Sequence, residues 1–517
     1  MAKKLLKAGI VVSTMTLLSR ILGLVRDIVV AKVIGADSAA DVFFFANKIP
    51  NFLRRLFSEG AFAQAFIPVL TEVMEKESSQ RQREFIAKVS GTLGVVVFIT
   101  AIIGVAGSSV LAGIFGIGWF IEYVDGGEDG EKFLLASTLL KITFPYIFFI
   151  SLTAFAGAIL NTLNKFAVAS FTPVLLNISI IACAYFLSPY VPDPSFALAW
   201  GVFIGGVVQL GFQVPFLHRA GVLVLPKWGW RDHHVVKVRT LMIPALFGVS
   251  VSQINLLLDT MIASFLVTGS ISWLYYSDRL LEFPLGLFGI AIATVILPAL
   301  SKNHVNEDKK TFSETLDWAI KLIASLGIPA AVGLFVLSLP MLLLIFQRGA
   351  FSVDDGVMAS YSLMAYSFGL FGFMLVKILA PAFYSRQDTK TPVKYGIITM
   401  VANMVFNLIF AIPFGYVGLA IATAISGWLN AILLYQRLHK SNVYRLSRKM
   451  LVFVTKIVVA SLIMGFVVYS WSSGMDWANL DTWARFKGVA IGIVGAVAIY
   501  VITILMLGVR PHQFVKH

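Results

Sequence analysis

Long apolar stretches recur along the whole 517-residue chain, and short polar segments separate them. Many of these stretches approach the roughly 20 residues that cross a bilayer as an α-helix, whereas a transmembrane β-barrel would show strands of about ten residues with alternating polarity. Hydropathy predicts about fourteen spans. They lie near residues 8–34, 42–70, 89–116, 134–161, 166–188, 196–218, 238–268, 272–301, 314–346, 356–385, 391–413, 416–437, 451–472 and 484–509. The pattern therefore predicts an all-α polytopic membrane protein.

The composition supports this fold class and excludes a large soluble enzyme. Hydrophobic residues make up 58% of the chain and charged residues 13%, whereas a soluble domain is nearer half apolar and a quarter charged. The single cysteine, Cys183, excludes internal disulfides and Cys-based metal sites. The basic N-terminus resembles a signal peptide, but the apolar stretch after it is too long and carries Arg20 and Arg26. We interpret it as a retained first helix.

The distribution of charge predicts the orientation of the chain in the membrane. The net charge is +14, from 41 Lys and Arg against 27 Asp and Glu. Basic clusters precede span one and follow spans two, six, eight, ten and twelve, all on one side, while the acidic loop 122–131 lies on the other. This is the positive-inside distribution, so both termini are expected in the cytoplasm. The basic charge therefore does not indicate nucleic-acid binding.

Two parts of the chain resemble each other in the placing of their prolines. Pro68 and Pro298 each lie shortly before a basic loop, and a Thr-Pro pair stands early in spans five and eleven. Six spans per part is an even number, so the two parts would run the same way through the membrane as parallel repeats. The expected organisation is an N-lobe of six helices, a cytoplasmic amphipathic linker, a C-lobe of six helices and two C-terminal helices, at residues 1–218, 219–237, 238–440 and 441–517.

Span one carries charges at a depth where they are costly. A charge in the middle of a membrane costs at least about 2.5–3.5 kcal/mol, yet this span contains Arg20, Arg26 and Asp27. Arg20 and Asp27 are seven residues apart, which places them on one helical face. Arg26 and Asp27 could instead lie near an interface and extend toward water. The deeper Arg20 favours a functional role.

Span two contains a second group of charges, formed by Arg54, Arg55 and Glu59. Arg55 and Glu59 are four residues apart and can pair. Pro50 and Gly60 predict a kinked or partly unwound helix, and broken helices line substrate sites in transporters. The alternative is a cytoplasmic helix end, but apolar sequence continues to residue 70. The sequence does not say which arginine faces a cavity.

Span eight contains the third group, in which Asp278, Arg279 and Glu282 precede Pro284. Spacings of three and four residues allow Glu282 to meet both of its neighbours. The triplet could simply neutralise itself. The internal repeat instead places it opposite the charged part of span two, so that both groups would line one central cavity.

Other charged residues give weaker signals. Lys48 is either a cavity cation or an interfacial anchor, and Asp41 is expected near the outer mouth as a helix cap. Asp259 and Lys377 are lone charges within spans. Each could form an ion site, but we slightly favour a packing or interface role. We find no HExxH motif, P-loop or GxSxG motif, so no enzyme activity, metal or cofactor is expected.

Buried arginines indicate an anionic substrate. The planar guanidinium matches phosphate oxygens with two parallel hydrogen bonds, which lysine cannot do. Two extra C-terminal spans add apolar surface that a water-soluble substrate would not need. An amphiphile with a charged head, plausibly a diphosphate, and a lipid tail fits both observations.

Several segments resemble the MurJ (MviN) family of bacterial lipid II flippases, in the MOP exporter superfamily. They are MTLLSRILGLVRD at 15–27, ADVFF at 40–44, PNFLRRLFSEGAF at 50–62, KITFPY at 141–146, YSDRLLEFP at 276–284 and FYSRQD at 383–388. The resemblance implies two six-helix lobes around a cavity and two further helices lining a lipid groove. It implies export of the undecaprenyl-diphosphate-linked peptidoglycan precursor across the inner membrane by alternating access, with membrane lipids and the cell-wall synthesis machinery as further partners.

The resemblance also assigns roles to residues. Functional arginines of the family match Arg20, Arg26, Arg54, Arg55 and Arg279, and functional acids match Asp41 and Glu59. Arg20, Arg26 and Arg279 would clamp the diphosphate, and Arg54 and Arg55 would guide its entry. The resemblance and the spacing of the remaining charges together lead us to expect gating or charge pairing by Asp27, Asp41, Lys48, Glu59, Asp278 and Glu282.

Two alternatives remain at this point. The first is a multidrug or oligosaccharide exporter of the same fold. A drug pump that exports cations should carry acidic cavity residues in excess, whereas arginines are prominent here. A membrane enzyme acting on polyprenyl-linked sugars would need a carboxylate or histidine dyad at a membrane face, which we do not find.

Overall fold

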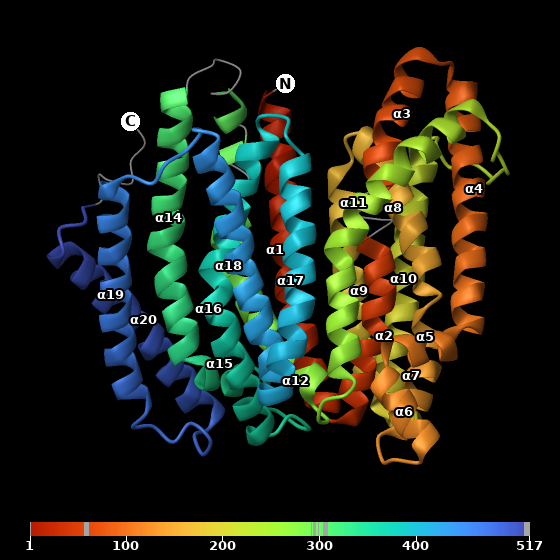
Figure 1. The fold of residues 1–517 in the computed structure, drawn as a ribbon. Coiled ribbons are helices and arrows are strands. Elements are labelled where there is room, and N and C mark those ends of the chain that lie inside the picture. Colours follow the sequence, from red (N-terminus) through yellow and green to blue (C-terminus); the bar gives the residue numbers. More distant parts are fainter. Residues whose placement is uncertain are drawn as a thin grey trace. The chain divides into compact units, whose positions relative to one another are not determined.

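The computed structural model describes residues 2–55, 62–290, 292, 296–297, 299–302 and 309–510 (Figure 1), and all regular structure in this part of the chain is helical. The α-helices are α1 (Ala2–Ile34), α2 (Ser38–Arg54), α3 (Phe62–Lys76), α4 (Ser79–Ala106), α5 (Ser108–Phe115), α6 (Ile117–Asp125), α7 (Gly130–Thr143), α8 (Tyr146–Thr162), α9 (Phe166–Phe186), α10 (Pro194–Arg219), α11 (His233–Ala263), α12 (Ser270–Pro284), α14 (Lys309–Val336), α15 (Ser338–Phe346), α16 (Val353–Tyr384), α17 (Lys390–Phe414), α18 (Tyr416–Lys440), α19 (Arg448–Ser472) and α20 (Thr482–Met506). A 3₁₀ turn, η2 (Ser188–Tyr190), follows α9, and a π-helix, η3 (Leu285–Ile290), follows α12.

Ten helical segments in the described residues are long and apolar enough to cross a membrane. The expected all-α membrane fold is therefore confirmed, while the count of about fourteen spans stays a prediction.

Several expected spans are divided into two helices. The stretch 89–116 breaks at Gly107, which ends α4 and donates its backbone N–H to the carbonyl of Ile103 at 2.7 Å. The stretch 314–346 breaks at Leu337, between α14 and α15.

The chain forms two compact units. Unit 1 contains residues 1–271 and 348–350, and unit 2 contains residues 272–347 and 351–517. The expected lobes, with boundaries at residues 218 and 238, are defined by a repeat in the sequence, whereas the two units are defined by packing. The division into these lobes therefore stays a prediction.

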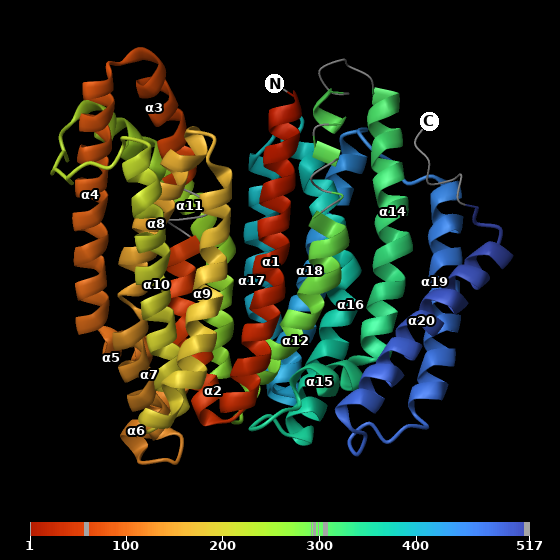
Figure 2. The ribbon, with the colours of Figure 1, turned by 180° about the vertical axis from the view of Figure 1, so that it is seen from behind.

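In unit 1, α1 packs against α9, α9 against α10, α2 against α7 and α11 against α3. Figure 2 shows the turn between α3 and α4 at one end of this unit and α6 at the other. The helix α1 ends at Gly35, whose φ of +62° suits glycine, and a Cβ there would lie 2.5 Å from the carbonyl oxygen of Ala350. The Ala350 N–H in turn donates to the Lys32 carbonyl at 3.0 Å. These contacts explain why residues 348–350 pack with unit 1.

In unit 2, α16 packs against α14 and α18, and the C-terminal pair α19 and α20 packs beside α14. The core includes Leu316, Met374, Leu434 and Ile457, which are essentially unexposed. Small residues permit close helix contacts, as is usual in membrane proteins. A Cβ on Gly369 of α16 would lie 2.7 Å from the Cα of Ala424 on α18.

This contact predicts opposite effects for two glycine substitutions in unit 2. Gly369→Ala should lower the free energy of unfolding by about 1–3 kcal/mol, because backbone atoms of α18 must move to make room. Gly396→Ala on α17, where a Cβ meets nothing within 4 Å, should be neutral or stabilising by up to about 1 kcal/mol through helix propensity. Thermal unfolding of the two purified variants in one detergent checks this. Equal stability of the two variants would contradict the packing argument.

Candidate functional site

Arg26 lies at the centre of a polar network between α1 and α9. Its Nε and Nη2 donate to Asp27 Oδ1 at 3.0 and 2.7 Å, and its Nη1 donates to Asn177 Oδ1 at 3.1 Å. Asn177 Nδ2 donates to the carbonyl oxygen of Ser19 at 3.2 Å. The Arg26 side chain is 15% exposed and that of Asp27 is 2% exposed. The network therefore holds a partly buried guanidinium in place and balances its charge.

Arg20 occupies a different environment on the same helix. Its side chain is exposed, and within the described part of the chain it makes no hydrogen bond or ion pair. One cation on α1 is thus held by neighbours, and a second is exposed without such partners in the described structure.

The helix α2 carries two charged residues that contact the end of α11 and the loop after it. Asp41, 2% exposed, accepts the backbone N–H of Gly269 at 2.7 Å. Lys48 Nζ donates to Thr260 Oγ1 at 3.1 Å. Asp41 does not cap its own helix, because the N-cap of α2 is Asp37, which accepts from the N–H groups of Ala39 and Ala40. Asp41 instead lies in the first turn and holds the segment after α11.

The structure places the rest of the predicted group of span two only in part. Arg54 is the last residue of α2, and its side chain lies outside the described residues. Arg55 follows as the half-buried C-cap, and Pro50 lies within the helix. Glu59 lies outside the described residues, so its predicted pairing with Arg55 stays a prediction.

The triplet of span eight lies on α12 in unit 2. Arg279 Nη1 donates to Glu282 Oε2 at 2.7 Å, and the guanidinium carbon lies 5.8 Å from the ring centre of Tyr275. The two side chains are 29% and 49% exposed, and Asp278 is exposed as well. The pairing of Arg279 with Glu282 is as the spacing predicts. The π-helix η3 follows Pro284 directly, and π-helical turns often mark functional sites.

Sequence reasoning missed the partners of these charges. Asn177, 5% exposed, stands in an apolar stretch of α9, and such a lone amide is the signal that could have revealed it. Lys132 is only 3% exposed and contacts Asp129 at 2.8 Å and Thr268 at 2.7 Å. The sequence shows the three-residue spacing between Lys132 and Asp129, but it does not show that Lys132 is buried.

Of the weaker candidates, Asp259 is half-buried beside Thr260, and Lys377 is exposed on α16.

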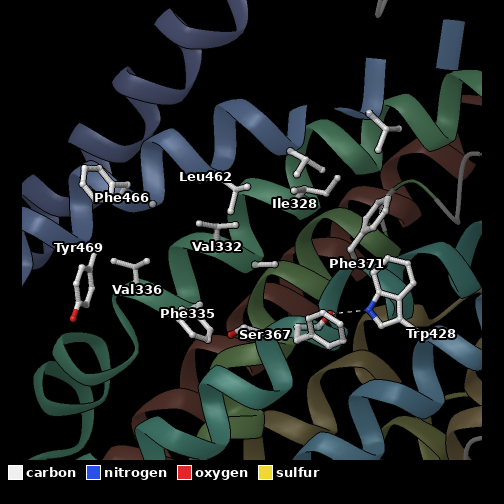
Figure 3. Close-up of a pocket in the computed structure, with 15 residues that line it drawn as sticks. Ile328, Val332, Phe335, Val336, Ser367, Phe371, Trp428, Leu462, Phe466 and Tyr469 are labelled. Carbon is white, nitrogen blue, oxygen red and sulfur yellow. Dashed lines mark hydrogen bonds between the residues drawn. The ribbon is translucent and has the colours of Figure 1, made fainter. Parts of the chain in front are cut away.

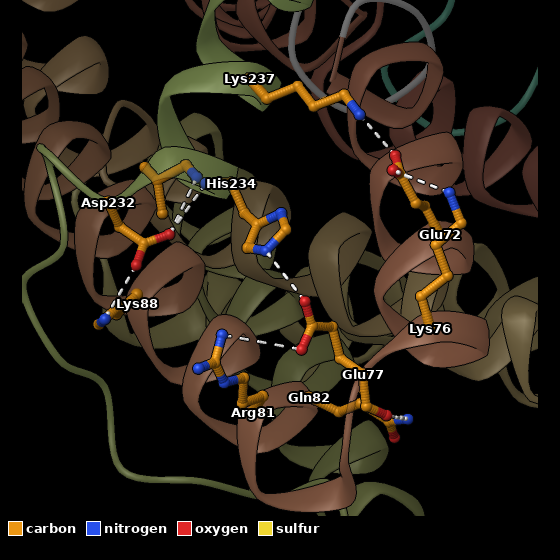
Figure 4. Close-up of polar contacts among 10 residues, drawn as sticks. Glu72, Lys76, Glu77, Arg81, Gln82, Lys88, Asp232, His234 and Lys237 are labelled. Carbon is orange, nitrogen blue, oxygen red and sulfur yellow. Dashed lines mark hydrogen bonds and ion pairs between the residues drawn. The ribbon is translucent and has the colours of Figure 1, made fainter.

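A separate ion-pair cluster joins the start of α11 to α3 and α4 (Figure 4). Glu72 contacts Lys237 and Lys76, Glu77 lies between His234 and Arg81, and Lys88 contacts Asp232 at 2.9 Å. The hydrogen bond and charge of Lys237, followed by those of Lys76, lower the pKa of Glu72. Burial tends to raise the pKa of Asp232, but Lys88 and the N–H groups of Val235 and His234 outweigh it and lower that pKa. The cluster fastens α11 to its neighbours.

In the part of the chain that the structure describes, no three His, Cys, Asp or Glu side chains come together as metal ligands. The arrangement found is one of guanidinium groups on otherwise apolar helices. Guanidinium groups of this kind can bind an anion such as a phosphate.

Comparison with known proteins agrees with this chemistry. The family described as lipid II flippase MurJ matches residues 30–486. The probable lipid II flippase MurJ of Vibrio cholerae serotype O1 is 60% identical over 511 residues, which cover 98% of this chain and 97% of that protein. A solved lipid II flippase MurJ in an inward closed conformation superposes with a TM-score of 0.79 at 30% identity, covering 96% of this chain and 99% of its own. An inward-facing multidrug resistance MATE family transporter of the MOP superfamily shares the fold, with a TM-score of 0.66 at 14% identity over 84% of this chain and 98% of its own.

The Arg26 network predicts that Asn177 contributes measurably to stability. Asn177→Ala should lower the free energy of unfolding by about 1–3 kcal/mol, because it removes one acceptor from a partly buried guanidinium. The loss should be smaller when Arg26 is already replaced by Met, since the two residues share one interaction. Thermal unfolding of the single and double variants measures this coupling. Asn479→Ala, at an exposed site, is the control, and strictly additive losses would contradict the network.

The Asp232 contact predicts an acid-sensitive attachment of α11. The depressed pKa of Asp232 stabilises the fold above the ordinary aspartate pKa of about 3.9, and this contribution is lost as pH falls through the lower folded value. The stability difference between wild type and Asp232→Asn should therefore stay constant from pH 7 to about pH 4 and vanish below that range.

The control for this measurement is Asp193→Asn. Asp193 caps α10 as Asp232 caps α11, but it makes no ion pair within the described residues. A pH-independent difference for Asp232→Asn, or the same pH dependence in both variants, would refute the role of Lys88.

Proposed function

This chain belongs to the lipid II flippase MurJ family, and on that premise we propose that it moves lipid II from the cytoplasmic to the periplasmic leaflet of the inner membrane by alternating access. It is a multi-pass membrane protein and a transporter rather than an enzyme. The observation that carries the proposal is the set of arginine side chains held on apolar helices of both units. A guanidinium binds diphosphate oxygens with two parallel hydrogen bonds.

In this proposal the substrate competes for arginines that acidic partners hold at rest. Arg20, open on α1, would contact the diphosphate first, and Arg26 and Arg279 would exchange Asp27 and Glu282 for phosphate oxygens. Arg54 and Arg55 would guide entry, with Glu59 as the resting partner of Arg55. Asp41, Lys48 and Asp278 would contribute to gating or charge pairing.

An apolar pocket in unit 2 supports an amphiphilic substrate (Figure 3). It has a volume of about 640 Å³ and lies among α14, α16, α18 and α19. Phe335, Phe371, Trp428 and Leu462 line it, and the indole N–H of Trp428 is occupied by the carbonyl of Phe368 at 2.8 Å. A wall with so few available polar groups suits a hydrocarbon chain. We propose that the C-terminal helices help to form a groove for the lipid tail.

The basic residues are concentrated in the loops expected on the same side as both termini, which supports cytoplasmic placement of the termini. Contact with the cell-wall synthesis machinery stays a prediction of the family resemblance. A drug exporter of the MATE type is not favoured, because the family match and the prominent arginines both indicate an anionic substrate.

Substitution of Arg279 tests the proposed recognition. Arg279→Ala and Arg279→Lys should each lower lipid II export by about 10–100-fold, because a charge-assisted hydrogen bond contributes about 1.5–3 kcal/mol and lysine lacks the planar fork. The measurement is periplasmic exposure of lipid II in cells that depend on the variant. Arg445→Ala, in the loop before α19, should export normally. Full activity of Arg279→Lys, at wild-type membrane levels, would rule out bidentate recognition.

The source of energy gives a second test. The sequence has no nucleotide-binding motif, and one elementary charge moving through 100 mV gains about 2.3 kcal/mol. The inside-negative potential would draw the empty, positively charged carrier back to its inward-open state. Collapse of the potential at constant ATP should stop lipid II exposure within minutes. Continued flipping at zero potential, with arrest only on loss of a sodium or proton gradient, would contradict this coupling and direct attention to Asp259.

A further inference from the structure

The segment between α10 and α11 crosses α4 as an extended strap, residues 221–232. The N–H of Lys227 donates to the carbonyl of Ala87 at 2.8 Å, and the N–H of Gly229 donates to Thr92 Oγ1 at 3.1 Å. A Cβ on Gly91 would lie 2.2 Å from the Lys227 carbonyl oxygen. The two backbones therefore touch directly, which requires glycine at this position of α4.

Asp232 fixes the C-terminal end of the strap. Its carboxylate accepts the N–H groups of His234 and Val235 at 3.0 and 3.4 Å, which caps α11, and also contacts Lys88 at 2.9 Å (Figure 4). The strap is thus held against α4 along its length and at its junction with α11. Side chains that point away from α4 are presented in a fixed arrangement.

These outward side chains are large and apolar. Leu225 is 84% exposed, Trp228 59% and Trp230 40%. The two indoles are stacked, with ring centres 5.8 Å apart and planes at 6°. The guanidinium of Arg239 lies 4.2 Å from the Trp230 ring centre and donates to the Trp230 carbonyl oxygen at 3.3 Å. Large apolar side chains that are exposed and fixed in position indicate a surface that binds a partner.

The charges around Leu225, Trp228 and Trp230 indicate the chemistry of the partner. Arg219, Lys227 and Arg231 are exposed around these side chains, while two nearby acids, Asp232 and Glu84, both contact Lys88. The strap begins where α10, an apolar helix long enough to span a membrane, ends at Arg219. Tryptophan belongs at the boundary between lipid headgroups and acyl chains, and basic residues beside it are attracted to anionic lipids.

We propose that the strap is a docking surface for anionic phospholipid headgroups of the leaflet at which α10 ends. Leu225, Trp228 and Trp230 lie among the upper acyl chains and glycerol groups. Arg231 and Arg239 bind the lipid phosphates. Because the strap caps α11 through Asp232, the lipid surface also fixes the position of the first turn of that helix.

A spin label on the full-length chain tests this proposal. Cys183 is the only cysteine in the sequence, so Cys183→Ala with Leu225→Cys gives a single labelling site. Tyr190→Cys is the matched control, because Tyr190 is also 84% exposed but lies in η2, outside the strap. The protein is placed in vesicles of phosphatidylcholine with increasing phosphatidylglycerol. Collision of the label with oxygen and with a water-soluble nickel complex reports its depth.

The proposal predicts that the label at 225 becomes about fivefold less accessible to the nickel complex as phosphatidylglycerol increases, because each basic residue near an anionic surface contributes about fivefold. High salt should reverse this change, and the label at 190 should not respond. Arg231→Gln with Arg239→Gln should weaken the dependence clearly, although Arg219 and Lys227 keep their charges. Lys440→Gln with Arg445→Gln, which removes the same charge elsewhere, should keep it.

Three outcomes would overturn the proposal. The label at 225 could remain as accessible to water as the label at 190 in every lipid mixture, which would assign the strap to a protein partner. It could be equally buried without phosphatidylglycerol, which would show apolar insertion without headgroup binding. The variant with Arg231→Gln and Arg239→Gln could retain the full lipid dependence. None of these outcomes depends on lipid II transport, so the test is independent of the proposed function.

Discussion

A charged side chain that is removed from water needs partners that replace the water, and this requirement is met separately in each of the two units. On α1, Asp27 and Asn177 together accept three hydrogen bonds from Arg26. On α12, Glu282 accepts from Arg279 at 2.7 Å. Both guanidinium groups have an acidic partner close by, so neither carries an uncompensated charge within the described structure. Helix packing serves this end, because Asn177 reaches Arg26 only through the contact between α1 and α9.

The same constraint explains how such a site can bind and release an anion. Removing water from a guanidinium costs less free energy when a carboxylate already pairs with it. An incoming diphosphate can replace that carboxylate and make similar hydrogen bonds. Binding then becomes an exchange of partners rather than the creation of a new charge pair. The partial exposure of Arg26 and Arg279, at 15% and 29%, leaves room for that exchange. In the proposed transport, release would follow when the acidic partner returns.

Much of the fold follows from the sequence, because the length of apolar stretches reports helices directly. Breaks within those stretches were harder to predict, since Gly107 ends α4 through local backbone geometry that hydropathy does not register. The charged residues of the site were visible because charge in an apolar stretch is rare, and the Arg279–Glu282 pair followed from spacing. The partners of Arg26 and Asp41 were not visible, because Asn177 and Gly269 reach them only through tertiary packing.

The central claim is that the arginines recognise the diphosphate of a lipid-linked substrate. Native mass spectrometry of the purified full chain with lipid II, with undecaprenyl phosphate and with a panel of cationic drugs tests it most directly. The account predicts binding of lipid II that is about tenfold or more tighter than that of undecaprenyl phosphate, since the second phosphate adds charge-assisted hydrogen bonds, and little binding of the drugs. Equal binding of the monophosphate lipid, or preferential binding of a cationic drug, would contradict it.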